Sequence, residues 1–354
     1  MPDSPPPLQD FALAPRVVAW QGRHGRSSLP WQHLRDPYRV WLSEIMLQQT
    51  QVATVLAYYP RFLERLPDVA ALAAAPADEV LSLWSGLGYY NRARNLHRCA
   101  QVVMAEHGGR FPSTAQALAE LPGIGRSTAA AIAAFCHDER AAILDGNVKR
   151  VLTRVLGFGD DLASAASERQ LWAHATALLP AAGADMPAYT QGLMDLGATL
   201  CVSRRPACPG CPLADLCVAR REGQPEAYPV KTRKLKRSRR ENWWLWLVHE
   251  GAVWLQQRPA QGIWAGLWSL PLLDDEAAVL QAAAALGLAG ETALELQPAI
   301  DHALTHLDWR LHPRRAVLKR PADPGAVLGP GRWVSADGLT AIGLPAPLRK
   351  LLAA

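Results

Sequence analysis

Two acidic residues stand where a carboxyl group could act on a substrate, and the first is Glu44. It lies in the apolar segment VWLSEIMLQQTQ (40–51). On a helix it shares a face with Trp41, Leu47 and Gln48. Such neighbours remove water from a carboxyl group, which raises its pKa and lets it hold a proton near neutral pH. Glu44 is therefore a candidate general acid; the alternative is an exposed glutamate on an amphipathic helix.

The second acidic residue is Asp145, in AAILDGNVKRVL (141–152). It follows an apolar run and precedes Gly-Asn, which is the form of a helix N-cap, and capping alone is the structural alternative. One acid that donates a proton and one that stays ionised form the arrangement that breaks glycosidic bonds. The sequence does not show whether Glu44 and Asp145 meet in space.

A glycine turn, LPGIGRST (121–128), lies between the two acids and is followed by a small-residue run. Gly123 and Gly125 allow close approach of another backbone, and a helix N-terminus after the turn offers N–H groups to an anion. With a helix on each side, the turn fits a helix-hairpin-helix that binds a DNA phosphate without reading sequence. A nucleotide-binding βαβ turn is disfavoured, because no strand precedes the turn and a third glycine is missing.

Four cysteines follow the spacing C-x6-C-x2-C-x5-C, and these are Cys201, Cys208, Cys211 and Cys217. In a reducing compartment such crowding favours a metal over disulfides. Zinc sites usually show two short cysteine pairs, so this spacing favours an iron–sulfur cluster, with zinc as the alternative. Arg204 and Arg205, between the first two cysteines, are either phosphate contacts or surface charge.

The elements that must position these residues are helical in the first two thirds of the chain. Apolar residues recur at spacings of three and four residues through 31–156, which indicates helices, and Ala-rich helices follow in 161–200. Residues 218–241 lose hydrophobicity and indicate a linker. The remainder is predicted to be α+β, so the chain combines an all-α region with an α+β domain.

Within the last region, WWLWLVHEGAVWLQQRP (243–259) indicates two strands around a His-Glu-Gly turn. LHPRRAVLKRP (311–321) is another strand candidate, and EAAVLQAAAALG (276–287) is a helix candidate.

Charge is concentrated in one segment, KTRKLKRSRR (231–240), which we call the basic strap. The chain has 354 residues and a net charge of +5, yet the strap carries seven Lys or Arg, and the rest is slightly acidic. Closely spaced cations suit nucleic acid, and a solvated linker is the alternative. The sequence has no run that would span a bilayer and no secretory signal, so we expect a cytoplasmic protein, associated with the nucleoid if it is bacterial.

Taken together, these motifs resemble the MutY adenine DNA glycosylases of the helix-hairpin-helix, endonuclease III-like superfamily. The resemblance is dense over 29–217 and looser from 242 onward. The matching segments are LPW (29–31), VWLSEIMLQQTQVATV (40–55), LWSGLGYYNRARNL (83–96), LPGIGRSTA (121–129), ILDGNVKRVL (143–152) and MDLGA (194–198), together with the cysteine spacing.

The resemblance implies a DNA repair enzyme that flips adenine out of the duplex opposite 8-oxoguanine or guanine and removes it. Glu44 matches the acid that protonates N7 of adenine. Asp145 matches the carboxylate that stabilises the oxocarbenium-like sugar and can bond transiently to its anomeric carbon. Trp31 and Gln191 match pocket positions beside the flipped base.

The resemblance also implies which residues recognise 8-oxoguanine. Residues that probe or wedge the base stack match Gln49, Thr50, Leu87 and Tyr89, and for the last two core packing is the alternative. In the C-terminal region the family's Phe-Ser-His loop corresponds to Leu304-Thr305-His306, so Thr305 and His306 are candidate contacts to the oxidised base.

Ser127 stands where the bifunctional relatives carry a lysine whose amine forms a Schiff base with the sugar. Serine cannot form that imine, so we expect a monofunctional glycosylase, with Lys149 as an incidental nucleophile. Two alternatives remain: a bifunctional enzyme of the endonuclease III type and a non-catalytic DNA-binding module.

The implied organisation is an all-α catalytic region over 1–217 with a [4Fe-4S] cluster, a basic linker over 218–241, and a Nudix-like domain over 242–354. A six-helix domain covers about 31–140 with the helix-hairpin-helix at 117–135. A cluster domain is formed by 1–30 and 141–217. The segment after GIWAGLWSLP lacks the Glu-rich box of Nudix hydrolases, so no pyrophosphatase activity is expected. Double-stranded DNA is the expected partner of a monomer, and no membrane is involved.

Overall fold

The computed structural model describes residues 12–232, 236–288, 294–319 and 323–353. They divide into two compact units. The first contains the chain up to 63, 67–73 and 98–234, and the second contains 64–66, 74–97 and the chain from 235 onward.

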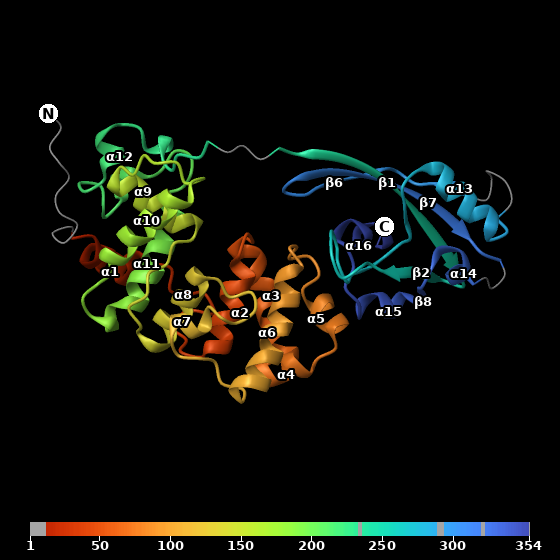
Figure 1. Ribbon diagram of the computed structural model, residues 1–354, viewed down its shortest axis with the longest axis horizontal. Coiled ribbons are helices and arrows are strands. Elements are labelled where there is room, and N and C mark those ends of the chain that lie inside the picture. Colours follow the sequence, from red (N-terminus) through yellow and green to blue (C-terminus); the bar gives the residue numbers. More distant parts are fainter. Residues whose placement is uncertain (1–11, 233–235, 289–293, 320–322, 354) are drawn as a thin grey trace. The chain divides into compact units, whose positions relative to one another are not determined.

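The first unit is helical, and none of its described residues forms a strand (Figure 1). In the described part of this unit, short 3₁₀ helices lie at Gly183–Asp185, Cys208–Gly210 and Pro225–Ala227. The α-helices that lie wholly or partly in this unit are α1 (Leu13–His24), α2 (Pro37–Leu47), α3 (Val52–Arg65), α4 (Val69–Ala74), α6 (Asn91–His107), α7 (Ala115–Leu118), α8 (Arg126–His137), α9 (Gly146–Leu156), α10 (Ala165–Ala177), α11 (Met186–Thr199) and α12 (Val218–Arg221).

Local sequence signals begin and end the helices that matter for the site. Asp36 caps α2 by accepting hydrogen bonds from the N–H groups of Tyr38 and Arg39, and Pro37 occupies the first helical position. At its C-terminal end α9 stops at Gly157, whose φ of 64° suits a residue without a side chain. Apolar faces of α1, α8, α9 and α11 then share one hydrophobic core, so these helices form a common framework.

The glycine turn adopts the predicted helix-hairpin-helix form in an abbreviated way. The helix before it, α7, is only four residues long, while α8 after it has twelve. Gly123 has a φ of 78°, a conformation that side chains disfavour, and Gly125 is the N-cap of α8.

The second unit contains an eight-stranded sheet with the path β3-β2-β1-β7-β5, to which β4, β6 and β8 add by pairing with β1, β7 and β2. Its strands are β1 (Ser238–His249), β2 (Ala252–Gln257), β3 (Trp268–Ser269), β4 (Leu272–Leu273), β5 (Glu295–Leu296), β6 (Ile300–Ala303), β7 (Leu307–Val317) and β8 (Arg332–Val334). Its further helices are α5 (Ala77–Leu83), α13 (Glu276–Ala285), α14 (Pro324–Leu328), α15 (Ala336–Thr340) and α16 (Ala346–Leu352). The predicted all-α region followed by an α+β region is thereby confirmed.

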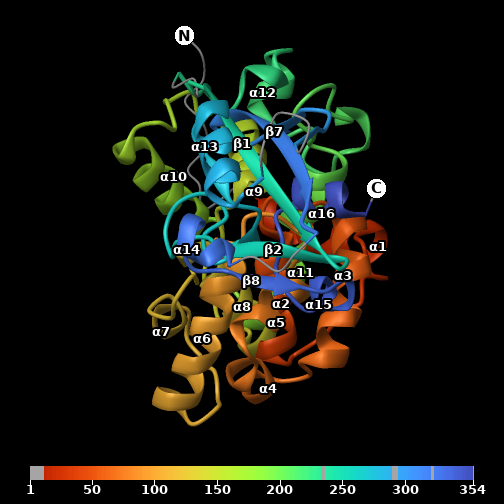
Figure 2. The ribbon, with the colours of Figure 1, turned by 90° about the vertical axis from the view of Figure 1, so that its right-hand side faces the viewer.

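The centre of the sheet is the parallel pair β1 and β7, which run side by side (Figure 2). The predicted turn between β1 and β2 forms at Glu250 and Gly251, with φ values of 47° and 80°. One sheet face shares an apolar core with α13, to which Leu245, Leu247 and Val279 contribute.

The segment 218–241, expected to be a linker, carries regular structure at both ends. It starts with α12, and its last residues already belong to β1. The strand β1 begins within the basic strap, because arginines of the strap contact residues of the sheet. Arg237 pairs with Asp308, and Arg240 lies 5.5 Å from the ring centre of Trp309.

Residues 74–97 belong with the C-terminal sheet, a grouping that the sequence did not indicate. Two hydroxyl groups, of Ser85 and Tyr90, donate to the Leu344 carbonyl at 3.2 and 2.9 Å. The indole N–H of Trp268 donates to Asp78 at 3.1 Å. These polar contacts join the segment before α6 to the segment before α16, and α5 to the strand β3. In the described ranges we find no helix with the length and apolarity needed to cross a bilayer.

Candidate active site

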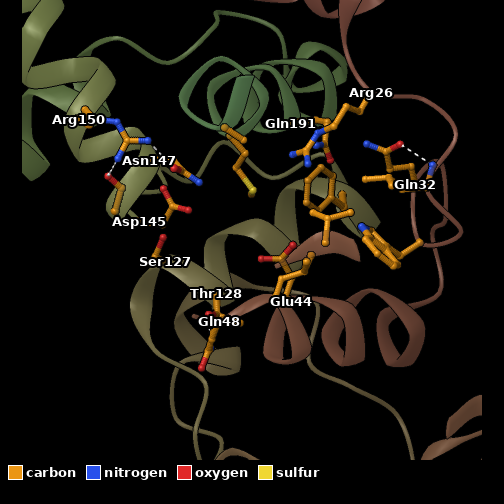
Figure 3. A pocket seen from close by; sticks show the side chains of 18 of the residues that line it. Arg26, Gln32, Glu44, Gln48, Ser127, Thr128, Asp145, Asn147, Arg150 and Gln191 are labelled. Carbon is orange, nitrogen blue, oxygen red and sulfur yellow. Dashed lines mark hydrogen bonds between the residues drawn. The ribbon is translucent and has the colours of Figure 1, made fainter. Parts of the chain in front are cut away.

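A cavity of about 1500 Å³ opens in the first unit, and both candidate acids line it (Figure 3). Glu44 enters from α2, Ser127 from α8, Asp145 from the start of α9 and Gln191 from α11. The structure thus brings together residues that are separated by up to 147 positions in the chain.

Burial in this cavity changes the acidity of Glu44. Loss of solvent raises its pKa to about 8, and the nearby Asp145 carboxylate contributes in the same direction. The exposed helix position that was the alternative is not what the structure shows. At neutral pH the Glu44 side chain is mostly protonated and can donate.

Asp145 lines the cavity and also caps a helix. Its carboxylate accepts a hydrogen bond from the Val148 N–H at 2.7 Å, so it is the N-cap of α9. Burial raises its pKa above the ordinary value, while the N–H groups of Val148 and Asn147 and the charge of Arg150 oppose that rise. The capping bond therefore holds the carboxylate at the cavity and favours its ionised form.

Ser127 lies beside Asp145 in the cavity (Figure 3). Its hydroxyl accepts a hydrogen bond from the Leu144 N–H at 3.0 Å, which ties α8 to the residue before Asp145. The amine of Lys149 forms an ion pair with Glu168. Lys149 is not among the described residues that line the cavity.

Trp31 and Gln191 also line the cavity. Trp31 is buried and packs edge-on against Tyr59, with 5.4 Å between ring centres. The amide nitrogen of Gln191 donates to the carboxylate of Asp195 at 2.8 Å. Gln49, which has a φ of 56°, and Thr50 also line the cavity, in the turn between α2 and α3.

Several polar residues of the cavity were missed by the sequence analysis: Arg26, Gln32, Gln48, Asn147 and Arg150. Arg150 donates to the Asn147 side chain and to the Cys201 carbonyl, both at 2.7 Å, so it connects the start of α9 with the cysteine segment. Asn147 and Arg150 follow Asp145 within five residues, and that proximity was the available signal. Arg26 had no comparable signal, because it is placed by the tertiary fold.

The hairpin glycines lie at the start of α8. A side chain at Gly125 would meet open space, so the N-terminus of α8 is accessible to a ligand. Accessible N–H groups at a helix start can bind an anion.

Four of the candidate 8-oxoguanine contacts, Leu87, Tyr89, Thr305 and His306, lie in the second unit, and two of these meet. The hydroxyl groups of Tyr89 and Thr305 are 2.9 Å apart although 216 positions separate them. Tyr89 is 48% exposed, whereas Leu87 is 5% exposed and packs in the interior. His306 is exposed next to Thr305 in the turn between β6 and β7.

The four cysteines with metal-ligand spacing line one cavity beside α9. Burial raises the pKa of Cys211 to about 11 and that of Cys217 above its usual range. The guanidinium of Arg154 donates to the Cys201 sulfur at 3.3 Å. As the described side chains stand, no three or more His, Cys, Asp or Glu form a group that would hold a metal ion.

Arg204 and Arg205 are exposed within the same cysteine segment. The backbone N–H of Arg205 donates to the Glu226 carboxylate at 2.7 Å. Their side chains are therefore accessible to a phosphate.

Comparison with known sequences agrees with both units. Residues 42–175 match the HhH-GPD superfamily of base excision DNA repair proteins, and residues 242–354 match the NUDIX domain. A helix-hairpin-helix beside a cavity with two carboxyl groups, joined to a Nudix-like sheet, defines the class as a base excision repair glycosylase.

More specifically, the chain belongs to the adenine DNA glycosylase family, as the MutY resemblance indicated. It is 35% identical to the adenine DNA glycosylase of Buchnera aphidicola subsp. Acyrthosiphon pisum, over 98% of each chain. It is 39% identical to the mouse adenine DNA glycosylase, over 73% of this chain and 60% of the mouse protein.

Solved structures match the helical part. A thermostable thymine-DNA glycosylase aligns with a TM-score of 0.54 and 28% identity, over 60% of this chain and 97% of that one. An endonuclease III–DNA complex aligns with a TM-score of 0.52 and 22% identity, over 61% of this chain and 98% of that one, and supports the shared fold.

Proposed function

We propose that this adenine DNA N-glycosylase removes adenine mispaired with 8-oxoguanine or guanine, and that it leaves the DNA strand uncut. The observation that carries the proposal is the pair of carboxyl groups in one cavity, with the pKa of Glu44 raised to about 8. DNA repair and DNA binding follow from the family. The identity of the opposite base and the absence of strand cleavage are the proposed parts.

Glu44 supplies the proton. With a pKa of about 8, about nine tenths of the Glu44 side chains are protonated at pH 7. Proton donation to N7 of a flipped adenine lets the base leave neutral, which lowers the barrier to breaking the N-glycosidic bond. A solvent-exposed glutamate would be ionised at this pH and could not donate.

Asp145 stabilises the sugar. As the base leaves, positive charge develops on the anomeric carbon, and a carboxylate held by the Val148 N–H can face that charge without moving. Water then completes the hydrolysis, directly or after a transient bond between Asp145 and the sugar.

Ser127 and Lys149 together support a monofunctional reaction. A hydroxyl at position 127 cannot form an imine with the opened sugar. The amine of Lys149 forms an ion pair with Glu168, so it is already engaged with another side chain. Without an imine, the strand is not cut by elimination.

Recognition of 8-oxoguanine is assigned to Tyr89 and Thr305. Their hydroxyl groups form one hydrogen-bonding edge at the exposed surface of the second unit. Thr305 can donate to or accept from an oxidised base while Tyr89 stacks on a neighbouring one. The exposed His306 adds a second polar group. Leu87 is buried, so we assign it to packing behind Tyr89.

The four-cysteine cavity fits a [4Fe-4S] cluster, because iron–sulfur cubanes are held by four cysteine thiolates. Cys201, Cys208, Cys211 and Cys217 would hold it. When bound, the cluster would lock the segment 201–217 and with it the exposed Arg204 and Arg205, which we assign to DNA phosphates together with the α8 N-terminus.

The mechanism is tested with Glu44→Gln on a duplex that carries one adenine opposite 8-oxoguanine. The glutamine amide has no acidic proton to donate to the base. Base release should therefore fall by roughly 100-fold or more, while duplex binding is kept. Glu64→Gln, at an exposed position on α3, is the matched control. Equal base release by Glu44→Gln and the control would make Glu44 a structural residue and favour a non-catalytic role.

Opposite-base recognition is tested separately. Thr305→Val and Tyr89→Phe each remove one hydroxyl while keeping shape, and each should reduce the rate ratio of adenine release opposite 8-oxoguanine to that opposite guanine. An unchanged ratio in both variants, and in His306→Ala, would contradict this assignment.

A further inference from the structure

The side-chain amide of Gln191 is fixed in one orientation by a buried carboxylate. Gln191 lines the active-site cavity from α11, and Asp195 follows one turn later on the same helix. The Asp195 side chain is fully buried, and its Oδ1 accepts the amide nitrogen of Gln191 at 2.8 Å.

Asp195 is itself surrounded by donors. Arg26 donates its backbone N–H to Oδ2 at 2.9 Å and its Nε–H to Oδ1 at 2.7 Å. A second guanidinium nitrogen of Arg26 lies 2.7 Å from Oδ1. Both oxygens of the Asp195 carboxylate therefore accept hydrogen bonds, and a carboxylate paired with a guanidinium in this way acts only as an acceptor.

This arrangement decides which end of the Gln191 amide a bound base meets. If the amide turned over, its carbonyl oxygen would face the Asp195 carboxylate at hydrogen-bonding distance, and two acceptors would be buried against each other. The nitrogen is therefore held by Asp195, and the carbonyl oxygen is the end left for the cavity. Figure 3 shows Arg26 and Gln191 on the same side of the cavity.

We propose that Asp195, supported by Arg26, is a positioning residue that presents Gln191 as a hydrogen-bond acceptor and so makes the cavity select purines with a 6-amino group over 6-oxo purines. The inference rests on the proposed placing of Gln191 beside the flipped base. An adenine N6 amino group donates to this oxygen. Hypoxanthine and guanine offer a 6-oxo acceptor at the same position and are rejected, because the two oxygens repel each other.

The distinction matters for a repair enzyme that meets both purines in every mispair. General acid catalysis by Glu44 acts at N7, which adenine, guanine and hypoxanthine all carry. The acid therefore does not separate the 6-amino base from the 6-oxo bases. A fixed acceptor at position 191 would supply that discrimination.

The test compares single-turnover release of adenine and of hypoxanthine, each opposite 8-oxoguanine in the same duplex. The proteins are the full chain, Asp195→Asn, Gln191→Leu, and Asp185→Asn as a matched control at an exposed position before α11. Asparagine can turn its own amide, so Gln191 is no longer held in one orientation. The adenine-to-hypoxanthine rate ratio should fall roughly tenfold or more in Asp195→Asn and in Gln191→Leu. Asp185→Asn should keep the original ratio.

An equal decrease of both rates in Asp195→Asn would give Asp195 a purely structural role and overturn the proposal. If circular dichroism shows that Asp195→Asn does not fold, Gln191→Leu decides, and an unchanged ratio in that variant also overturns it. Failure of the unsubstituted chain to release adenine would contradict the proposed function itself, which is distinguishable from a loss of selectivity.

Discussion

One carboxyl group, Glu44, sets the pH range in which the site can act. Its pKa is raised to about 8 by burial and by the neighbouring Asp145. A general acid works only while protonated, so single-turnover adenine release should fall as pH rises through about 8. The measurement is the rate between about pH 4 and pH 9.5 with saturating protein. A rate that already declines through the ordinary glutamate range, near pH 4 to 5, would mean that Glu44 is not the donor.

The residues proposed to act on the substrate could be predicted from the sequence, because they lie in recognisable motifs. The residues that hold them in place could not be predicted. Glu44 and Asp145 sit in distinctive apolar contexts, and the structure places both in one cavity. Arg26 and Asp195 lie 169 positions apart, and only the packing of α1 against α11 brings them together. Nothing in either local sequence indicates that pairing.

Among the elements, the basic strap has the clearest electrostatic prediction. Lys231, Lys236 and Arg239 are exposed, whereas Arg237 is paired with Asp308. Replacing the three exposed cations by glutamine should flatten the slope of log affinity against log salt by about 2 to 3, because each phosphate contact contributes about 0.9. Fluorescence anisotropy at several salt concentrations measures the slope.

Three exposed cations elsewhere, at Arg98, Arg110 and Lys319, provide the comparison. If the slope of log affinity against log salt is the same for the strap variant and the unsubstituted chain, the strap does not contact DNA and is a solvated linker.

Helices and strands that depend on a local sequence pattern were predicted. Those that depend on pairing with a segment far away in the chain were not. The hairpin of β1 and β2 follows from two apolar runs on either side of His-Glu-Gly, and α13 follows from its own apolar run. The parallel pairing of β1 with β7 depends on segments about 70 positions apart, so no local pattern indicates it. The same holds for the strand that starts within the strap and for α5, which binds the sheet through Asp78 and Trp268.

For the whole molecule, the proposed cluster should support the fold of the cysteine segment and DNA binding together. Cys211→Ser replaces one of the four ligands, so purified protein should contain less than about four iron atoms per chain, with weaker visible absorbance and weaker duplex binding. Cys99→Ser, at a buried cysteine outside the cavity, is the matched control and should retain iron. Full iron content in Cys211→Ser would contradict the ligand assignment.

The most direct test of the account is single-turnover incubation with a duplex that carries one adenine opposite 8-oxoguanine, each sample being divided and analysed with and without alkali. Adenine should be released, and strand breaks should appear only after alkali, because Ser127 cannot form the imine that leads to cleavage. Efficient strand breaks without alkali would contradict the monofunctional assignment and place the protein with the bifunctional enzymes. No release of adenine from iron-loaded protein would contradict the central claim.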